Sequence, residues 1–261
     1  MTDLDFSYNT VNASTIYFEI GRYFDDLLPN QRETIIDVPK VQGYTQLLKK
    51  FEPREIQIIG VLYADDNATL NTRIEGFSDY LYKDSDKILI FNDKPHKFYY
   101  AQFLEKVRTE KRGGGILASY QLNMRANDPL GYAVIADTST QLNKAKGYYW
   151  DITNTGQYYS WPTITITFNQ NQSHIYVANN TLTEARIDIS KTFLSGQILK
   201  IDTKLIRILL NNIYSPAGLG DGGLGLYAMP ILKTGINEFE IGTDDATLNA
   251  SIVVNYRKTY L

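Results

Sequence analysis

The chain has 261 residues, enough for one large all-β domain or two domains of ordinary size. Hydrophobic residues make up 43% and charged residues 21%, a balance that allows a buried core and excludes wholesale disorder. A net charge of −3 without any Lys/Arg-rich run argues against a nucleic-acid-binding protein, because phosphate contacts require a basic surface. The lack of cysteine excludes disulfides, zinc–thiolate sites and thiol nucleophiles. No apolar run approaches the ~18 residues of a membrane span, so no membrane partner is expected.

The first clear elements are a strand and a helix. Residues 54–63 are rich in β-forming side chains, and the polar stretch that follows can cap a helix. Apolar residues then recur at the spacing of one helical face, namely Leu70, Ile74, Phe77 and Leu81. This pattern predicts an amphipathic helix over about residues 66–83.

Strands resume after the helix. Residues 87–91 and 97–107 are β-rich and flank a turn at residues 92–95. A triple glycine at residues 113–115 interrupts the chain. Apolar and polar residues then alternate over residues 116–125, and this period of two predicts a strand with one buried face.

A turn-forming stretch, Asn-Asp-Pro-Leu-Gly from Asn127, predicts a break between two domains, residues 1–129 and 130–261. The second half has the cleaner β pattern, in which Ile164, Ile166 and Phe168 alternate with threonines. Further short β-rich stretches follow at residues 175–177, 185–189, 198–201, 205–210, 239–241 and 252–256. Turn signals separate them, as is typical of an antiparallel sandwich.

Neither histidine is expected to act in catalysis. His96 follows a Lys-Pro turn, His174 lies in an Asn/Gln-rich loop, and the two fall in different predicted domains. The sequence also has no G-x-S-x-G elbow that could carry a nucleophile. We therefore expect no catalytic residue and no enzymatic activity.

Acidic pairs and a glycine-rich stretch are the candidates for metal and cofactor sites. The pairs begin at Asp25, Asp65 and Asp244, and none has the spacing of a calcium loop or of a glycosidase. Asp65-Asp66 is expected to cap the helix instead. Residues 218–223 match G-x-G-x-x-G, but the glycines and proline that follow are incompatible with the helix of a dinucleotide site. No metal and no cofactor are expected.

Aromatic clusters in the second half leave a further possibility open. Residues 148–150 and 158–161 are the candidates for a sugar-binding platform. Packing in the core and at strand edges is favoured, because the loops show no clear aromatic–carboxylate cluster. The alternative function is a carbohydrate-binding β-sandwich protein that recognises a host cell-wall saccharide.

Short motifs follow one another along nearly the whole chain in a specific order. In the first half they are Phe6-Ser-Tyr-Asn9, Val38-Pro39 with Gly43, the strand and helix of residues 54–83, Leu89 to Pro95, Phe98-Tyr-Tyr-Ala101, and Asn127-Asp128-Pro129 with Tyr132. In the second half they are Asn154-Thr-Gly156, Trp161-Pro162-Thr-Ile-Thr-Ile166, Leu199-Lys-Ile-Asp202, Met229 to Asn237, and Tyr256-Arg257 with Tyr260-Leu261. In this order the motifs resemble the distal tail protein family of siphophages, in its simple form without inserted modules.

The resemblance implies a mainly β fold with two domains. The N-terminal domain would be β-sandwich-like, with one helix and an extended arm, and the C-terminal domain a galectin-like antiparallel β-sandwich. It implies a structural virion protein at the tip of a long non-contractile tail, assembled in the host cytoplasm as a homohexameric ring. The ring would have a central channel for DNA and would connect the tail tube protein with the tail-associated lysin or tail-tip protein, with receptor-binding proteins at its periphery.

The segment between the first strand and Arg54 is too long for an ordinary connection, whose median is about 4–6 residues. Its apolar residues come in β-prone clusters that one small domain cannot bury completely. The predicted arm lies within residues 18–38, and we expect its apolar side chains to contact the neighbouring subunit. These are Phe18, Ile20, Tyr23, Phe24, Leu27, Leu28, Ile35 and Ile36.

Overall fold

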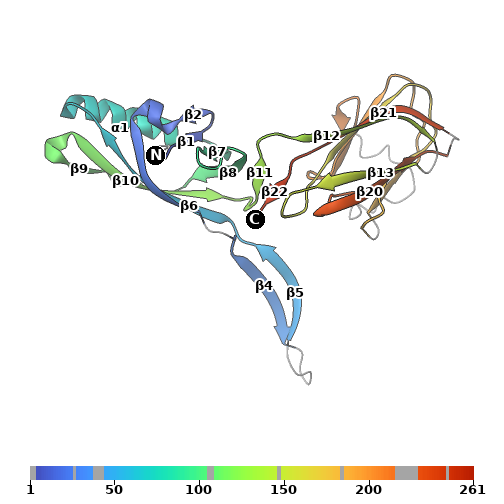
Figure 1. The fold of residues 1–261 in the computed structure, drawn as a ribbon, viewed down its shortest axis with the longest axis horizontal. Helices are drawn as coiled ribbons and strands as arrows, with labels where there is room; N and C mark the ends of the chain where they lie inside the picture. Colours follow the sequence, from blue (N-terminus) through green and yellow to red (C-terminus); the bar gives the residue numbers. More distant parts are fainter. Residues whose placement is uncertain are drawn as a thin grey trace. The chain divides into compact units, whose positions relative to one another are not determined.

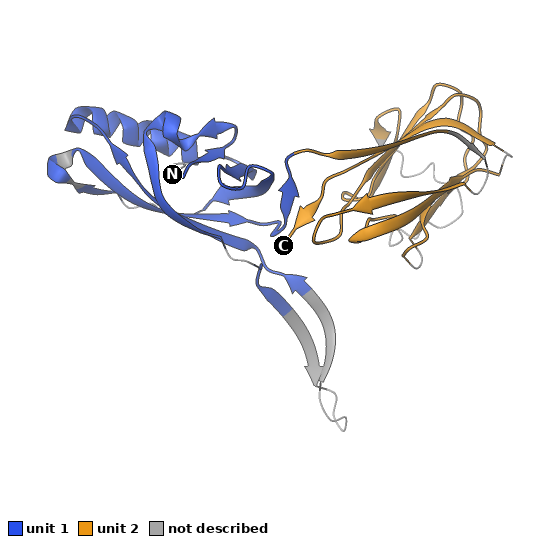
Figure 2. Ribbon diagram, in the orientation of Figure 1, with its two compact units in different colours: residues 1–134, 261 blue, residues 135–260 orange. Residues whose placement is uncertain are grey.

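The structure is a computed structural model that describes residues 4–25, 28–37, 44–104, 109–145, 148–182, 185–214, 229–244 and 247–261. Over these residues the chain is mainly β, with one α-helix and two short 3₁₀ helices, η1 (Ala13–Ile16) and η2 (Gly113–Gly115). It divides into two compact units, residues 1–134 with Leu261 and residues 135–260 (Figure 2). None of the helices in this part of the chain is long and apolar enough to cross a membrane.

The first unit is built on an antiparallel sheet whose main path runs in the order β2-β1-β7-β8-β10-β6-β3 (Figure 1). The strands of this path are β1 (Phe6–Tyr8), β2 (Val11–Asn12), β3 (Phe18–Asp25), β6 (Arg54–Tyr63), β7 (Lys87–Phe91), β8 (Lys97–Phe103) and β10 (Leu117–Ala126). Two short strands lie off the path, β9 (Glu110–Arg112) beside β10 and β11 (Gly131–Ala133) beside β8. Because β11 pairs with β8, the first unit continues past Pro129, where the sequence predicted a break.

The long strands β6 and β10 pair over ten residues each, from Arg54 opposite Ala126 to Tyr63 opposite Leu117. One face of each strand is buried and the other is partly or fully exposed. This alternation confirms the predicted strands at residues 54–63 and 116–125. At Gly60 an added Cβ atom would lie 2.4 Å from the carbonyl oxygen of Glu19 and 2.5 Å from the Phe18 ring. Glycine is therefore required at this point of the pairing between β3 and β6.

The predicted helix is confirmed as α1 (Asn67–Leu81). The Asp66 carboxylate accepts a hydrogen bond of 2.8 Å from the Thr69 amide and so caps the helix, as predicted. Leu70, Phe77 and Leu81 bury the apolar face of the helix against the sheet. The Phe77 ring stacks on the Phe18 ring with centroids 4.7 Å apart.

Two strands of the first part of the chain stand apart from this sheet. β4 (Gln31–Asp37) and β5 (Tyr44–Phe51) pair with each other from Gln31 opposite Phe51 to Asp37 opposite Tyr44. Among the described strands they form a two-stranded sheet of their own. In Figure 1 this hairpin follows β3 and leads back into β6.

The second unit contains two antiparallel sheets, in the orders β12-β21-β14-β17-β18-β19 and β13-β20-β15-β16. Their strands are β12 (Asp137–Ala145), β13 (Tyr148–Asn154), β14 (Thr163–Phe168), β15 (Ile175–Asn179), β16 (Arg186–Ile189), β17 (Ile198–Asp202), β18 (Arg207–Leu210), β19 (Ile213–Tyr214), β20 (Gly235–Gly242) and β21 (Thr247–Tyr256). A last short strand, β22 (Thr259–Tyr260), follows. Side chains from both sheets share one core, including Ile164, Ile166 and Phe168 from one sheet and Phe239 and Ile241 from the other. The predicted antiparallel sandwich is confirmed.

Candidate assembly interface

The hairpin of β4 and β5 is held at its base by the two strands that flank it. β3 ends at Asp25, β6 begins at Arg54, and these strands are antiparallel neighbours in the sheet. Between them, the Glu52 amide donates a hydrogen bond of 2.8 Å to the Asn30 carbonyl. The chain therefore leaves the sheet and returns to it at adjacent points.

A buried ion pair joins these two points. Arg54 Nη1 donates to Asp25 Oδ1 at 2.8 Å, and the two side chains are 0% and 4% exposed. The hydroxyl of Tyr99 and Lys94 Nζ donate to Asp25 Oδ2 at 2.8 and 3.4 Å. Arg54 Nε also donates to the Pro129 carbonyl at 3.0 Å. The pair thus connects both ends of the hairpin to β8 and to the segment before β11.

The surroundings of Asp25 favour its ionised form. Burial by itself raises the pKa of the carboxyl. The hydrogen bond from Tyr99 and the charge of Arg54 outweigh burial, and they hold the pKa of Asp25 below its ordinary value. Burial and the nearby Asp25 charge raise the pKa of the Tyr99 phenol, so Tyr99 stays a neutral donor. At neutral pH the group is therefore a charged pair with a neutral donor beside it.

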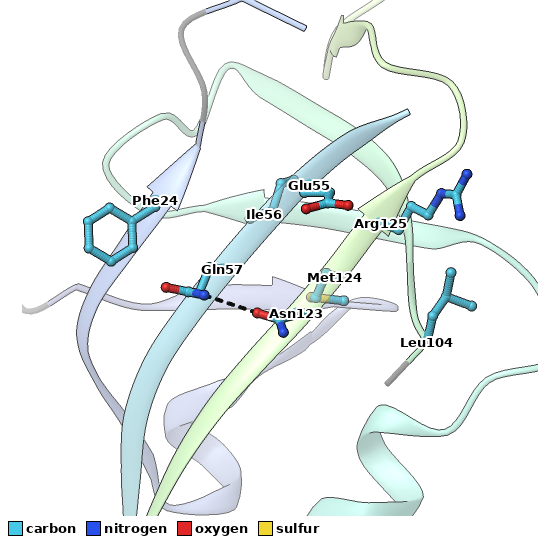
Figure 3. A pocket seen from close by; sticks show the side chains of 8 residues that line it. All are labelled: Phe24, Glu55, Ile56, Gln57, Leu104, Asn123, Met124 and Arg125. Carbon is cyan, nitrogen blue, oxygen red and sulfur yellow. Dashed lines mark hydrogen bonds between the residues drawn. The ribbon is translucent and has the colours of Figure 1, made fainter. Parts of the chain in front are cut away.

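The sheet is hollowed near the end of β3 and the start of β6 (Figure 3). The hollow has a volume of about 410 Å³. Its lining residues come from β3, β6, β10 and the residue that follows β8: Phe24, Glu55, Ile56, Gln57, Leu104, Asn123, Met124 and Arg125. A second hollow, of about 320 Å³, shares Glu55 and Arg125 with the first and reaches Asn30, Glu52, Pro53 and Arg54 at the hairpin base.

The first hollow combines apolar edges with neutral amides. The side chains of Phe24 and Leu104 are about half exposed, at 50% and 51%. Between them, Gln57 Nε2 donates to Asn123 Oδ1 at 3.2 Å, and both amides lie on neighbouring strands in Figure 3. Aromatic and aliphatic groups mixed with amides and single charges of both signs suit a protein contact surface.

Two family models match the chain, in order along the sequence. One describes a phage tail protein RIFT-related domain and matches residues 11–116. The other describes the C-terminal domain of a siphovirus-type tail component and matches residues 155–260. The chain belongs to the distal tail protein family of siphophages. As a member of that family it is a β-rich structural protein of the phage tail, and the resemblance found in its motifs is confirmed.

One relative, the distal tail protein of phage SPP1, was compared both in sequence and in structure. The distal tail protein of Bacillus phage SPP1 is 25% identical over 176 residues, which cover 66% of this chain and 66% of that protein, just under two thirds. The crystal structure of the SPP1 Dit protein, described as a paradigm of the hub adsorption apparatus in phages that infect Gram-positive hosts, aligns over 99% of both chains. That alignment has a TM-score of 0.78 at 19% identity, and it shows a shared two-domain β fold.

Some of the residues predicted for the arm belong to the core of the first unit, and others are exposed. Phe18 is 1% exposed, and Ile20 and Tyr23 pack on the same core, so these three belong to the sheet of their own unit. Phe24 and Leu28 are exposed, at 50% and 56%. Leu27 lies outside the described residues. Ile35 and Ile36 lie on β4, and only the backbone of these two residues is described. The hairpin starts later than residue 18 because residues 18–25 complete the sheet beside β6.

Other predicted candidates are spread over the molecule. His174 in the second unit lies 3.5 Å from Asp188 and 3.2 Å from Asp244. Trp150 is buried, whereas Tyr149 is half exposed. The glycine-rich stretch of residues 218–223 lies outside the described residues. Within the described ranges, no three His, Asp or Glu side chains are placed to hold a metal ion.

In the second unit the structure brings together an aromatic side chain, a carboxylate and a guanidinium from separate strands. On the four-stranded sheet, the Tyr176 hydroxyl donates to Glu240 at 2.7 Å, and the Arg186 guanidinium lies 4.1 Å from the centre of the Tyr176 ring. Burial and the bond to Glu240 raise the pKa of Tyr176 to about 12. Glu240 is 64 residues from Tyr176 along the chain, so no local sequence pattern could have joined them.

Proposed function

We propose that the chain assembles with copies of itself into a hexameric ring at the distal end of the tail, in which the β4–β5 hairpin joins neighbouring subunits. The observation that carries this proposal is that, among the described strands, the hairpin pairs with no third strand. A two-stranded hairpin is marginally stable in water, and its open edges invite pairing with another chain. A head-to-tail contact repeated by rotation closes into a ring, and the family resemblance supplies the number six.

The ring would serve as a hub. One side would contact the tail tube protein and the other the tail-associated lysin or tail-tip protein, with DNA passing through a central channel. Receptor-binding proteins would attach at the periphery, where the sandwich of the second unit is the docking domain. Membership of the family supports this position in the tail. The proposed role involves no chemical step.

Native mass spectrometry of the purified chain and of a hairpin variant tests the proposal. In the variant a short Gly-Ser linker replaces residues 31–51, while β3 and β6 remain intact. We expect a sixfold species from the parent chain and folded monomers from the variant. A control variant, Leu205→Ser, removes an exposed apolar side chain from a turn of the second unit and should keep the sixfold species. A hairpin variant that still forms the parent's oligomer would contradict the proposal.

The alternative function, binding of a cell-wall saccharide, has one observation in its favour, the Tyr176–Glu240–Arg186 group beside the half-exposed Tyr149. The polar groups of this set are already engaged, however, because Tyr176 donates to Glu240 and Arg186 donates to Asp188. We therefore propose a docking role for this unit. Calorimetric titration with host cell-wall polysaccharide should show no binding. Binding that Tyr149→Ala abolishes in a folded protein would establish the alternative instead.

A further inference from the structure

We propose that the buried Asp25–Arg54 pair is a positioning device, which fixes the direction in which the hairpin leaves the first unit and so aligns it with a second copy of the chain. The inference rests on the proposed role of the hairpin in assembly. It concerns a pair of residues that make no proposed contact with the neighbouring subunit themselves.

The Asp25–Arg54 pair lies at the base of the hairpin. Asp25 is the last residue of β3 and Arg54 is the first residue of β6, so the pair joins the two points where the hairpin begins and ends. The hydrogen bond between the Glu52 amide and the Asn30 carbonyl lies nearer still to the hairpin. A small rotation at this base is multiplied along seven- and eight-residue strands, because each residue of a strand adds roughly 3.3 Å.

Asp25 and Arg54 each make more than one contact. Asp25 accepts hydrogen bonds from Arg54 and Tyr99 at 2.8 Å each, and Arg54 also donates to the Pro129 carbonyl. The Arg54 guanidinium lies 5.4 Å from the centre of the Tyr99 ring. A planar guanidinium with several fixed donors holds its partners in a narrow range of orientations. The base of the hairpin is therefore held in direction as well as in distance.

A buried ion pair adds little net stability to a fold. Removing two charges from water costs nearly as much as their attraction returns, so a well-packed apolar pair would stabilise the fold equally well. What an apolar pair lacks is directionality. The Asp25 and Arg54 side chains are 4% and 0% exposed and lie at the base of the hairpin. Orienting the hairpin explains such a pair better than stabilising the fold does.

The test separates orientation from stability. The double variant Asp25→Leu with Arg54→Met removes both charges and leaves no buried ion unpaired. Because the chain has no cysteine, Arg32→Cys on β4 and Glu75→Cys on α1 can be spin-labelled without side reactions, and both positions are exposed. Electron–electron double resonance then measures the distance between hairpin and helix, with labelled chains diluted in unlabelled ones.

We expect the double variant to unfold at a similar urea concentration to the parent, with a broader distance distribution and a dissociation constant of the oligomer raised by about tenfold. Tyr99→Phe removes a single hydroxyl contact to Asp25 and should broaden the distribution less, which provides a second variant if the double one does not fold. The matched control is Arg186→Met with Asp188→Leu. This exposed pair has the same nitrogen–oxygen distance of 2.8 Å, and its loss should change neither the hairpin–helix distance distribution nor the dissociation constant of the oligomer.

The outcomes distinguish this inference from the proposed function. A narrow distance distribution in folded double and Tyr99→Phe variants would overturn the positioning role, even if the hairpin replacement abolishes the ring. A broad distribution together with an unchanged oligomer would overturn the link to assembly. If the hairpin replacement leaves the oligomer intact, the proposed function fails, and the distance distribution alone then decides whether the pair orients the hairpin.

Discussion

Two Arg–Asp pairs in this molecule have the same shortest nitrogen–oxygen distance and different surroundings. Arg54 and Asp25 lie 2.8 Å apart at the hairpin base, with side chains 0% and 4% exposed. Arg186 and Asp188 also lie 2.8 Å apart, on the outer face of the second unit, with side chains 46% and 42% exposed. Distance alone therefore does not distinguish them, and burial does.

The physical difference is the access of water. Around Arg186 and Asp188, water and salt screen the attraction, and each group remains well solvated if its partner is lost. Around Arg54 and Asp25, a lost partner leaves a charge in a medium that cannot solvate it. The hydrogen bond from Arg186 lowers the pKa of Asp188, just as the surroundings of Asp25 lower the pKa of Asp25. The free energy lost when one partner is removed nevertheless differs between the two pairs.

The largest effect is expected from Asp25→Asn. This change leaves the Arg54 charge buried without a carboxylate, and we expect the free energy of unfolding of the first unit to fall by about 3–5 kcal/mol. Urea-dependent hydrogen exchange of the backbone amides of β3 and β6 measures it. The double variant Asp25→Leu with Arg54→Met is the control, and it should recover most of the loss. Equal losses in the single and double variants would show that the cost is one of packing.

Acid should reproduce part of this loss. The pKa of Asp25 is lower in the folded chain than in the unfolded chain, so its contribution is complete above the unfolded value of about 4 and is lost as the pH falls through the folded value. We expect the parent to lose stability below about pH 4 more steeply than the double variant. Parallel pH profiles for the two proteins would contradict this assignment.

A third comparison applies one substitution to a buried and to an exposed glycine. Gly60→Ala places a Cβ atom 2.4 Å from the Glu19 carbonyl oxygen, and we expect the overpacking to cost about 1–3 kcal/mol. Gly76 is an exposed residue of α1 with no atom near its Cβ position, so Gly76→Ala should stabilise the unit by about 0.5–1 kcal/mol. Thermal unfolding of both variants measures the two signs. A destabilising Gly76→Ala would contradict the expected contrast between the two positions.

The smallest effect is expected from Arg186→Met. Because this pair is exposed, we expect a change of about 0–1 kcal/mol in the free energy of unfolding of the second unit, smaller still in high salt. Denaturation at low and high salt measures it. A loss of stability comparable to that of Asp25→Asn would contradict the contrast between the buried and the exposed pair. It would show that the surface around Arg186 and Asp188 is less solvated than its exposure indicates.

The sequence determined the elements whose signals are local. The strand at residues 54–63 and the helix begun by Asp66 could be predicted because their apolar periods and caps lie within a few residues. The apolar and polar patterns of the sequence do not predict the strands β12 and β13. β12 is largely polar because it lies at the edge of its sheet and pairs only with β21 among the described strands, so it needs no continuous apolar face.

The tertiary structure alone decided which residues belong to the hairpin and which to the sheet. Phe18, Ile20 and Tyr23 carry the same β-prone signal as the residues that follow, and only the pairing of β3 with β6 separates them. The same holds for Asp25 and Arg54, which are 29 residues apart and become partners because antiparallel pairing places the end of β3 beside the start of β6. Composition and periodicity report how a residue relates to its near neighbours in the chain. Burial and long-range pairing depend on which segments meet, and they decide whether an aspartate or an arginine forms a buried ion pair or stays in water.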